Sequence, residues 1–328
     1  MKKIIYFLAI LLIASCKSDG KKSSNFRVLP ESSGKINHLS VVLSNDFWEG
    51  SIGETIRNVL AAPVDGLPQD EPLFTMNQIP PAVFSGFVTQ NRTVLKIETT
   101  QEANVKILKD VYARPQRVVL VTGPTKEAII DQIKGHEDDI IAAFKAEEIK
   151  EQQRRIKLSP NVNNTIKKKL GISITFPSAY RIAVDKDDFY WIRKDITTGH
   201  SNLMLYELPY GAIKKGDSLV GDILKLRDSI GRTHIPGRLD GTHMTTDDAY
   251  APFIFDTSID GKSSIETKGM WDVKKDFMAG PFINYIVDDK EHNRLLVAEG
   301  FVFAPSVEKR DYVFELESII RSIKFDEE

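Results

Sequence analysis

The stretch KEAIIDQIKGHEDDIIAAFKAEEIKEQQRRIK, residues 126–157, decides how this chain is organised. Its apolar residues recur along one helical face, which predicts a long helix interrupted near Gly135. From Glu147 onward the stretch is highly charged, and we interpret that end as a solvated helix leading to a second region. Strand patterns lie on both sides of the helix. We therefore place a domain boundary near Leu158-Ser159-Pro160.

Ahead of this helix, the sequence predicts an α+β domain over residues 37–158. The run Leu39–Leu43 is a short buried-type strand, and a helix over residues 47–62 follows it and stops at Pro63. Residues 105–112 fit either a helix or a strand. A helix there completes a ferredoxin-like βαββαβ order, whereas a strand makes an antiparallel meander. The other expected strands are residues 73–79, 93–98 and 117–122.

Behind the helix, residues 159–328 predict a second α+β domain. Successive strand-like runs are joined by short turns, which is typical of an antiparallel sheet. Helices are expected over residues 218–230 and 307–323. In one run, Phe189 and Trp191 share one strand face and Tyr190 and Ile192 the other, so both faces are expected to be covered. The predicted fold is thus two α+β domains, each a mainly antiparallel sheet with packed helices.

The chain begins with MKKIIYFLAILLIASC, residues 1–16. A basic start, an apolar run and small residues before a cysteine are typical of a secretory signal. The apolar run is shorter than the ~20 residues that cross a bilayer. Ile13-Ala14-Ser15-Cys16 resembles the lipobox of bacterial lipoproteins. That resemblance implies a signal peptide over residues 1–15, and a Cys16 that becomes the new amino terminus carrying diacylglycerol with palmitate-type acyl chains.

The predicted cellular location is the cell envelope, where Cys16 attaches the protein to the membrane. Residues 16–36 are polar and poor in aromatics, so we expect a lipidated flexible tether. Only one acidic residue lies in Lys17-Ser18-Asp19. The charge therefore does not choose between the periplasmic side of the inner or outer membrane and the cell surface.

Charge and cysteine content exclude some functions. The formal net charge of −2 rests on 44 basic and 46 acidic residues, and a mildly acidic chain is a poor partner for nucleic acid. Cys16 is the only cysteine. Once it is lipidated, no thiol remains for a disulfide, a metal or catalysis.

The sequence lacks the common catalytic motifs. There is no phosphate loop, no dinucleotide fingerprint, no nucleophile elbow and no His-Glu-x-x-His zinc helix. We therefore predict no cofactor and lean against an enzyme. A hydrolytic metal site could still combine His234, His243 and Asp247, although two histidines near a Pro/Gly loop are usually surface residues.

Trp48 and Trp191 are candidate stacking platforms for sugar rings. Aromatic residues in such strand patterns are, however, more commonly buried in the core.

Two resemblances extend this interpretation. The chain resembles an uncharacterised lipoprotein family of Bacteroidetes-type bacteria, which carries a domain of unknown function. The resemblance rests on the lipobox and on the stretches Ala61-Ala62-Pro63-Val64, Gly66-Leu67-Pro68-Gln69 and Glu71-Pro72-Leu73-Phe74. In the second half, Ile174-Thr175-Phe176-Pro177 and Gly300-Phe301-Val302-Phe303 followed by a helix resemble the PsbP/Mog1-type α+β sandwich. Members of that group mostly act as binding or assembly modules.

The leading hypothesis is a lipid-anchored, non-catalytic envelope protein that binds or helps to assemble an envelope protein partner. One alternative is a hydrolase of cell-wall or polysaccharide material with a site around His243 and Asp247. The other is a glycan-binding lipoprotein that uses Trp48 or Trp191.

Overall fold

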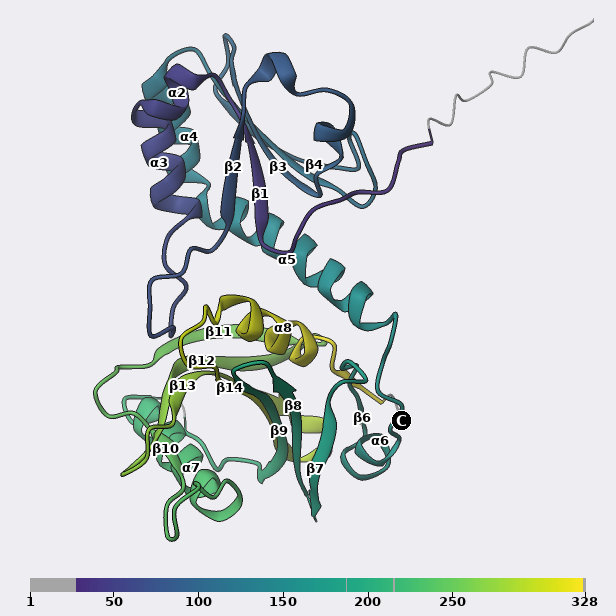
Figure 1. Ribbon diagram of the computed structural model, residues 1–328, viewed down its shortest axis with the longest axis vertical. Coiled ribbons are helices and arrows are strands. Elements are labelled where there is room, and N and C mark those ends of the chain that lie inside the picture. Colours follow the sequence, from purple (N-terminus) through teal and green to yellow (C-terminus); the bar gives the residue numbers. More distant parts are fainter. Residues whose placement is uncertain (1–27, 187, 215, 327–328) are drawn as a thin grey trace, which may run out of the picture.

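The computed structural model describes residues 28–186, 188–214 and 216–326. Figure 1 shows two sheets along the long axis of the molecule, with helix α5 (Glu137–Ile156) running from the first to the second. The predicted signal peptide, Cys16 and the tether up to residue 27 lie outside the described residues. Helices and strands are both abundant, so the α+β class is confirmed.

The first sheet corrects two predictions. Its strand order is β2-β1-β3-β5-β4, and all neighbours are parallel except β4, which runs antiparallel to β5. The prediction of a mainly antiparallel first sheet is therefore wrong. Residues 104–109 form strand β4, which excludes the helix alternative with its ferredoxin-like order, and the parallel neighbours exclude the antiparallel meander of the strand alternative. The strands are β1 (His38–Val42), β2 (Thr75–Ile79), β3 (Thr93–Thr99), β4 (Asn104–Lys109) and β5 (Arg117–Gly123).

The parallel first sheet is buried on both of its faces. Strands β1, β3 and β5 contribute side chains to apolar clusters on both faces of the sheet. Parallel strands covered on both faces have nearly continuous apolar runs such as Val118-Val119-Leu120-Val121, instead of alternating polar and apolar residues. Helices α3 (Ser51–Leu60), α4 (Lys126–Gly135) and α5 cover one face. The 3₁₀ turns η1 (Pro81–Val83) and η2 (Gly86–Gln90) belong to the loops on the other.

Both helices predicted in this half are divided. The stretch 126–157 breaks at His136 into α4 and α5, near the predicted interruption, and α5 starts with three acidic residues that suit a helix amino terminus. The expected helix over residues 47–62 is split at Gly50 into α2 (Asn45–Glu49) and α3. A Cβ on Gly53 would lie 1.9 Å from the Trp48 carbonyl oxygen, so only glycine allows α3 to fold back onto α2 this closely.

The predicted flexible tether is wrong from residue 30 onward. Ser32 N–H donates to the Arg114 carbonyl, and Arg114 N–H donates to that of Pro30. Ser33 N–H donates to Gln90, and its carbonyl accepts from Arg92 N–H. These backbone bonds hold the polar segment beside the first sheet, although its side chains bury little surface.

The second sheet is antiparallel, as predicted. Its order is β10-β12-β13-β14-β9-β8-β7, with β11 also paired to β12, and Figure 1 shows that it curls strongly. Its strands are β7 (Arg181–Lys186), β8 (Phe189–Ile196), β9 (Gly199–Pro209), β10 (Met244–Thr246), β11 (Phe253–Ile259), β12 (Lys262–Val273), β13 (Ala279–Asp289) and β14 (Arg294–Phe303). The turn η3 (Lys290–His292) joins β13 to β14. Helix α6 (Thr165–Leu170) and the small pair β6 (Ile172–Ser173) and β15 (Lys324–Phe325) lie at one side.

Helices cover both faces of this sheet. Helix α8 (Arg310–Ile320) packs on the face with Tyr190 and Ile192, towards the first sheet, and α7 (Leu219–His234) packs on the face with Phe189 and Trp191. The predicted division of these four side chains between two faces is confirmed.

The two halves of the chain are in direct contact. The Glu71 carboxylate accepts hydrogen bonds from the backbone N–H groups of Lys309 and Arg310, at the start of α8. Lys145 of α5 lies 2.8 Å from Glu317 of α8. Among the described residues, no helix has the length and apolar character that a membrane span requires.

Candidate functional site

A cavity of about 380 Å³ lies on the α7 face of the second sheet. That volume is within the range of small-molecule sites, about 300–1,000 Å³. Strands β8, β9, β12 and β14 supply its floor, and the loop after α7 supplies one wall. We call it the aromatic pocket. Its lining is Trp191, Arg193, Gly199, His200, Ile235, Pro236, Gly237, Arg238, Met244, Trp271, Val273, Met278, Phe301 and Phe303.

The aromatic side chains are held rigidly. Trp271 meets Phe301 edge-on at a centroid distance of 5.5 Å, and it lies 6.4 Å from Phe303. Its indole N–H donates to the Val302 carbonyl at 3.2 Å, and that of Trp191 donates to the Asn202 side chain at 3.0 Å. Because both indole N–H groups have partners within the protein, the two tryptophans offer a ligand hydrocarbon surface and no free donor.

His200 is a buried polar group of the pocket, with 9% of its surface exposed. Burial, assisted by the charge of Arg193, lowers the pKa of His200 to about 4, so the imidazole is neutral at pH 7. The Asn202 amide lies 2.8 Å from His200 Nδ1. Its oxygen already accepts from Trp191, so its NH₂ group donates to Nδ1. The hydrogen of the ring therefore sits on Nε2.

Both arginines of the lining are paired with carboxylates. Arg193 lies 3.2 Å from Asp195, and Arg238 makes a two-point contact with Asp276 at 2.6 and 3.1 Å. Each positive charge therefore has a nearby counter-charge. The pocket is an apolar, aromatic container with a neutral imidazole, which suits binding better than acid–base chemistry.

Among the predicted site residues that the structure describes, only Trp191 lines this pocket. His234 stacks on Phe189 with ring centroids 3.9 Å apart, and burial, together with the charge of Lys186, lowers its pKa. His243 pairs with Pro236 in the backbone bridge of the loop after α7. The Asp247 carboxylate accepts from Ala249 N–H in a turn. Trp48 lies in the first half, under the Arg57 guanidinium at 4.8 Å.

The proposed metal ligands do not come together. Among the described residues, the group of three that could share an ion is Asp289, Glu291 and His292, and it contains none of His234, His243 or Asp247. Asp289 is already paired with Arg294 at 2.8 Å, Lys262 at 3.1 Å and His292 at 2.9 Å. These contacts make the group an ion-pair cluster at the turn between β13 and β14.

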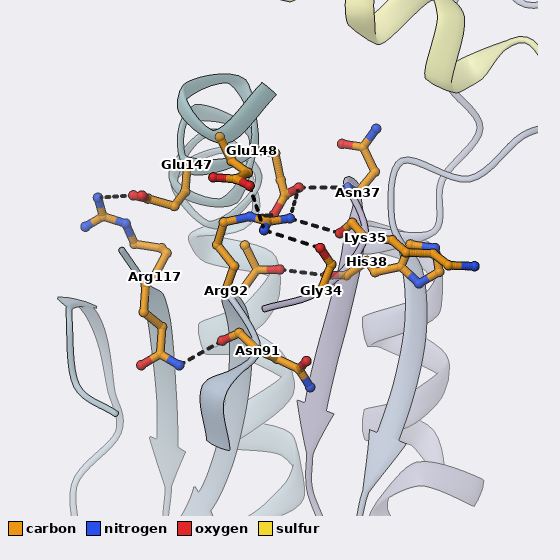
Figure 2. A network of polar contacts seen from close by, with 12 residues as sticks. Gly34, Lys35, Asn37, His38, Asn91, Arg92, Arg117, Glu147 and Glu148 are labelled. Atoms are coloured by element: carbon orange, nitrogen blue, oxygen red, sulfur yellow. Dashed lines mark hydrogen bonds and ion pairs between the residues drawn. The ribbon is translucent and has the colours of Figure 1, made fainter. Parts of the chain in front are cut away.

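A second buried polar site occupies the first half. Figure 2 shows Arg92 between Glu148 and the backbone of Gly34 and Lys35. Its guanidinium makes two 2.9 Å bonds to the Glu148 carboxylate, which also accepts from Asn37 N–H at 2.8 Å. Burial raises the pKa of Glu148, and the Arg92 charge opposes that shift. Since Arg92 is 2% exposed and Glu148 fully buried, we interpret this pair as structural.

This network corrects another prediction. The charged end of α5 is not simply solvated, because Glu147, Glu148 and Glu151 are buried. Arg117 pairs with Glu147 at 3.1 Å in the same way. The signal that could have revealed them is their spacing, since these glutamates continue the stripe of Ile140 and Phe144 by helical steps of three or four residues.

Comparisons with known proteins match both halves of the chain. Residues 159–322 match the family model described as Domain of unknown function (DUF4837), and residues 32–157 match Domain of unknown function (DUF8532). No curated protein matches.

Solved structures show weak likeness over about half of the chain. A crystal structure from Bacteroides thetaiotaomicron is 14% identical with a TM-score of 0.28, and the match covers 48% of this chain and 46% of that one. The Saccharomyces cerevisiae Ran-binding protein Mog1p is 8% identical, with coverage of 47% and 89% and a TM-score of 0.30. LpqN, described as involved in cell envelope biogenesis of Mycobacterium tuberculosis, is 12% identical, with coverage of 47% and 82% and a TM-score of 0.29. The chain thus spans less than half the length of the Bacteroides protein.

Proposed function

Because the chain belongs to the family defined by the domain of unknown function DUF4837, whose description names no activity, we propose a function from the geometry of the aromatic pocket. The protein is a non-catalytic binding module of the cell envelope. It holds an apolar molecule, or the apolar part of an amphiphile, in the pocket. The observation that carries this proposal is the apolar lining, in which both indole N–H groups are bonded within the protein.

The geometry of the pocket favours an apolar ligand over the two alternatives, a glycan site and a hydrolase site. A sugar site combines an aromatic face with several donors and acceptors for hydroxyl groups. Here the indole donors are occupied, the arginines are paired, and His200 Nε2–H is left as a side-chain donor, so an apolar ligand fits better than a glycan. The hydrolase alternative would need acid–base groups or metal ligands held together, and His234, His243 and Asp247 are not.

Binding is tested by titrating the full chain with the neutral apolar fluorophore phenylnaphthylamine. Trp191→Ala removes one aromatic wall and should weaken binding by about tenfold, the effect of losing ~1.4 kcal/mol of contact energy. Met278→Trp adds bulk to the lining without removing a wall and should weaken binding at least as much. Tyr250→Ala is the matched control, because Tyr250 is an exposed aromatic residue outside the lining.

Two results would contradict the proposal. One is wild-type affinity in both pocket variants. The other is an equal loss of affinity in the Tyr250→Ala control. Thermal unfolding of each variant separates loss of binding from loss of the fold.

The cellular address rests on the sequence around Cys16. We propose that Cys16 carries the lipid and keeps the pocket at a membrane surface, where an envelope protein partner can be met. The mass of the protein extracted from bacterial membranes checks this. The expected amino-terminal peptide starts at Cys16 with a diacylglycerol group, and an unmodified peptide that retains residues 1–15 would rule the anchor out.

A further inference from the structure

Two loops project at the mouth of the aromatic pocket. The first follows α7, over residues 235–243, and the second is the turn between β12 and β13, over residues 274–278. The two-point contact between Arg238 and Asp276 joins them. Leu239 and Phe277 are the next residues along each loop, so the ion pair fixes the positions from which both side chains project.

Both of these side chains are apolar and point into solvent. Phe277 is 98% exposed, more than any other large hydrophobic side chain among the described residues, and Leu239 is 53% exposed. Exposed hydrophobic residues gathered beside a binding pocket are typical of a surface that meets an apolar partner. Folding gives no reason for them, because neither side chain packs on the core clusters of the described residues.

We propose that these two loops are a membrane-contact element, and that the pocket takes an acyl chain from the bilayer into which Leu239 and Phe277 insert. This inference rests on the function proposed above and names the ligand class. Arg238 and Met278 line the pocket and are sequence neighbours of Leu239 and Phe277. The apolar tips therefore border the pocket mouth. An acyl chain that enters between the loops avoids a passage through water, which would expose its hydrocarbon surface.

The charges of the two loops indicate that they bind the hydrocarbon of the bilayer and not its anionic head groups. Residues 235–243 and 274–278 contain three basic and two acidic side chains. Two of the basic side chains are also paired, Arg238 with Asp276 and Lys274 with Asp248. Membrane binding through lysine and arginine uses clusters of about four to eight basic side chains, and these loops hold three. Insertion should therefore not become stronger when anionic lipid is added.

The test places a polarity-sensitive fluorophore at each tip. In a Cys16→Ser background, Phe277→Cys and Leu239→Cys each carry the only thiol of the full chain. With phosphatidylcholine vesicles, both labels should shift to shorter emission wavelength, and bromine on the lipid acyl chains should quench them several-fold. Phe87→Cys is the matched control, since Phe87 is 86% exposed but lies in the first half, and its label should not respond. The readout belongs to the labelled position, so vesicle binding through residues 1–15 does not produce it.

A second arm measures transfer. Changing Leu239 and Phe277 together to Ser should slow the uptake of a pyrene-labelled acyl lipid from vesicles several-fold, with the phenylnaphthylamine affinity unchanged. If the labels at 239 and 277 behave like the label at 87, the membrane contact is wrong. If those labels are shielded only when an envelope protein is added, the loops contact a protein partner and not the bilayer. If the wild-type protein does not bind phenylnaphthylamine at all, the proposed function itself is refuted.

Discussion

Replacing Arg227 by Met should lower the free energy of unfolding by about 3–5 kcal/mol, because the change leaves a buried carboxylate without its counter-charge. Arg227 is the central buried residue of α7, and its guanidinium lies 2.9 Å from Glu299, a fully buried side chain of β14. It also donates to Thr246 at 2.9 Å and stacks over the Phe282 ring at 3.8 Å. Urea-induced unfolding measures the loss.

Two further variants make this prediction specific. Arg232→Met removes an exposed arginine from the same helix, and its effect should stay within about 0.5 kcal/mol. The double variant Arg227→Met, Glu299→Gln removes both charges and should recover at least half of the single-variant loss. An Arg227→Met protein within about 1 kcal/mol of wild type, or a double variant no more stable than the single one, would show that the pair does not hold α7 in this way.

Replacing Glu317 by Gln is the second large effect, again about 3–5 kcal/mol at neutral pH. Glu317 lies on α8, where it meets Lys145 of the first half at 2.8 Å and Arg321 at 2.9 Å. Burial disfavours its charged form, but the charges of Lys145, Lys268 and Arg321 outweigh that penalty and lower its pKa to about 2. The substitution leaves these cations partly uncompensated where the two halves meet.

This effect depends on pH in a defined direction. A carboxyl group whose pKa is depressed in the folded state stabilises the protein above its ordinary pKa, and the contribution is lost as the pH falls. For Glu317 the window runs from about pH 4.5 down to about pH 2. The difference in unfolding free energy between wild type and Glu317→Gln should therefore shrink when urea unfolding is repeated at about pH 3.

The matched control is Glu308→Gln, an exposed glutamate just before α8, which should change stability by no more than about 0.5 kcal/mol at either pH. A Glu317→Gln deficit that is equally large at both pH values would mean that the lost contact is not the charge of this carboxylate. A deficit below about 1 kcal/mol at neutral pH would mean that Glu317 does not join the halves.

Some of the pocket could be recognised in the sequence, but its assembly could not. Trp191 and Trp271 are visible as aromatic residues in strand patterns, and Trp191 was a candidate ligand residue from its sequence alone. The pocket itself combines β8, β9, β12 and β14 with the loop after α7, from Trp191 to Phe303. The residues predicted for a metal site, His234 and His243, are close in sequence, yet one stacks on Phe189 and the other belongs to a loop bridge.

By itself, the sequence determined those features that depend on neighbouring residues. Short turns between successive strand-like runs gave the antiparallel second sheet, and period-two alternation gave the two faces of β8. Helical spacing gave α7, α8 and the break near Gly135. The tertiary structure alone decided which distant segments pair. Strands β1, β3 and β5 are parallel, and the segments that connect distant strands cover both faces of their sheet. Glu148 became buried because Arg92, 56 residues away, supplies its counter-charge. Local periodicity carries no information about such long-range partners, because they are set by how the packed elements meet in space.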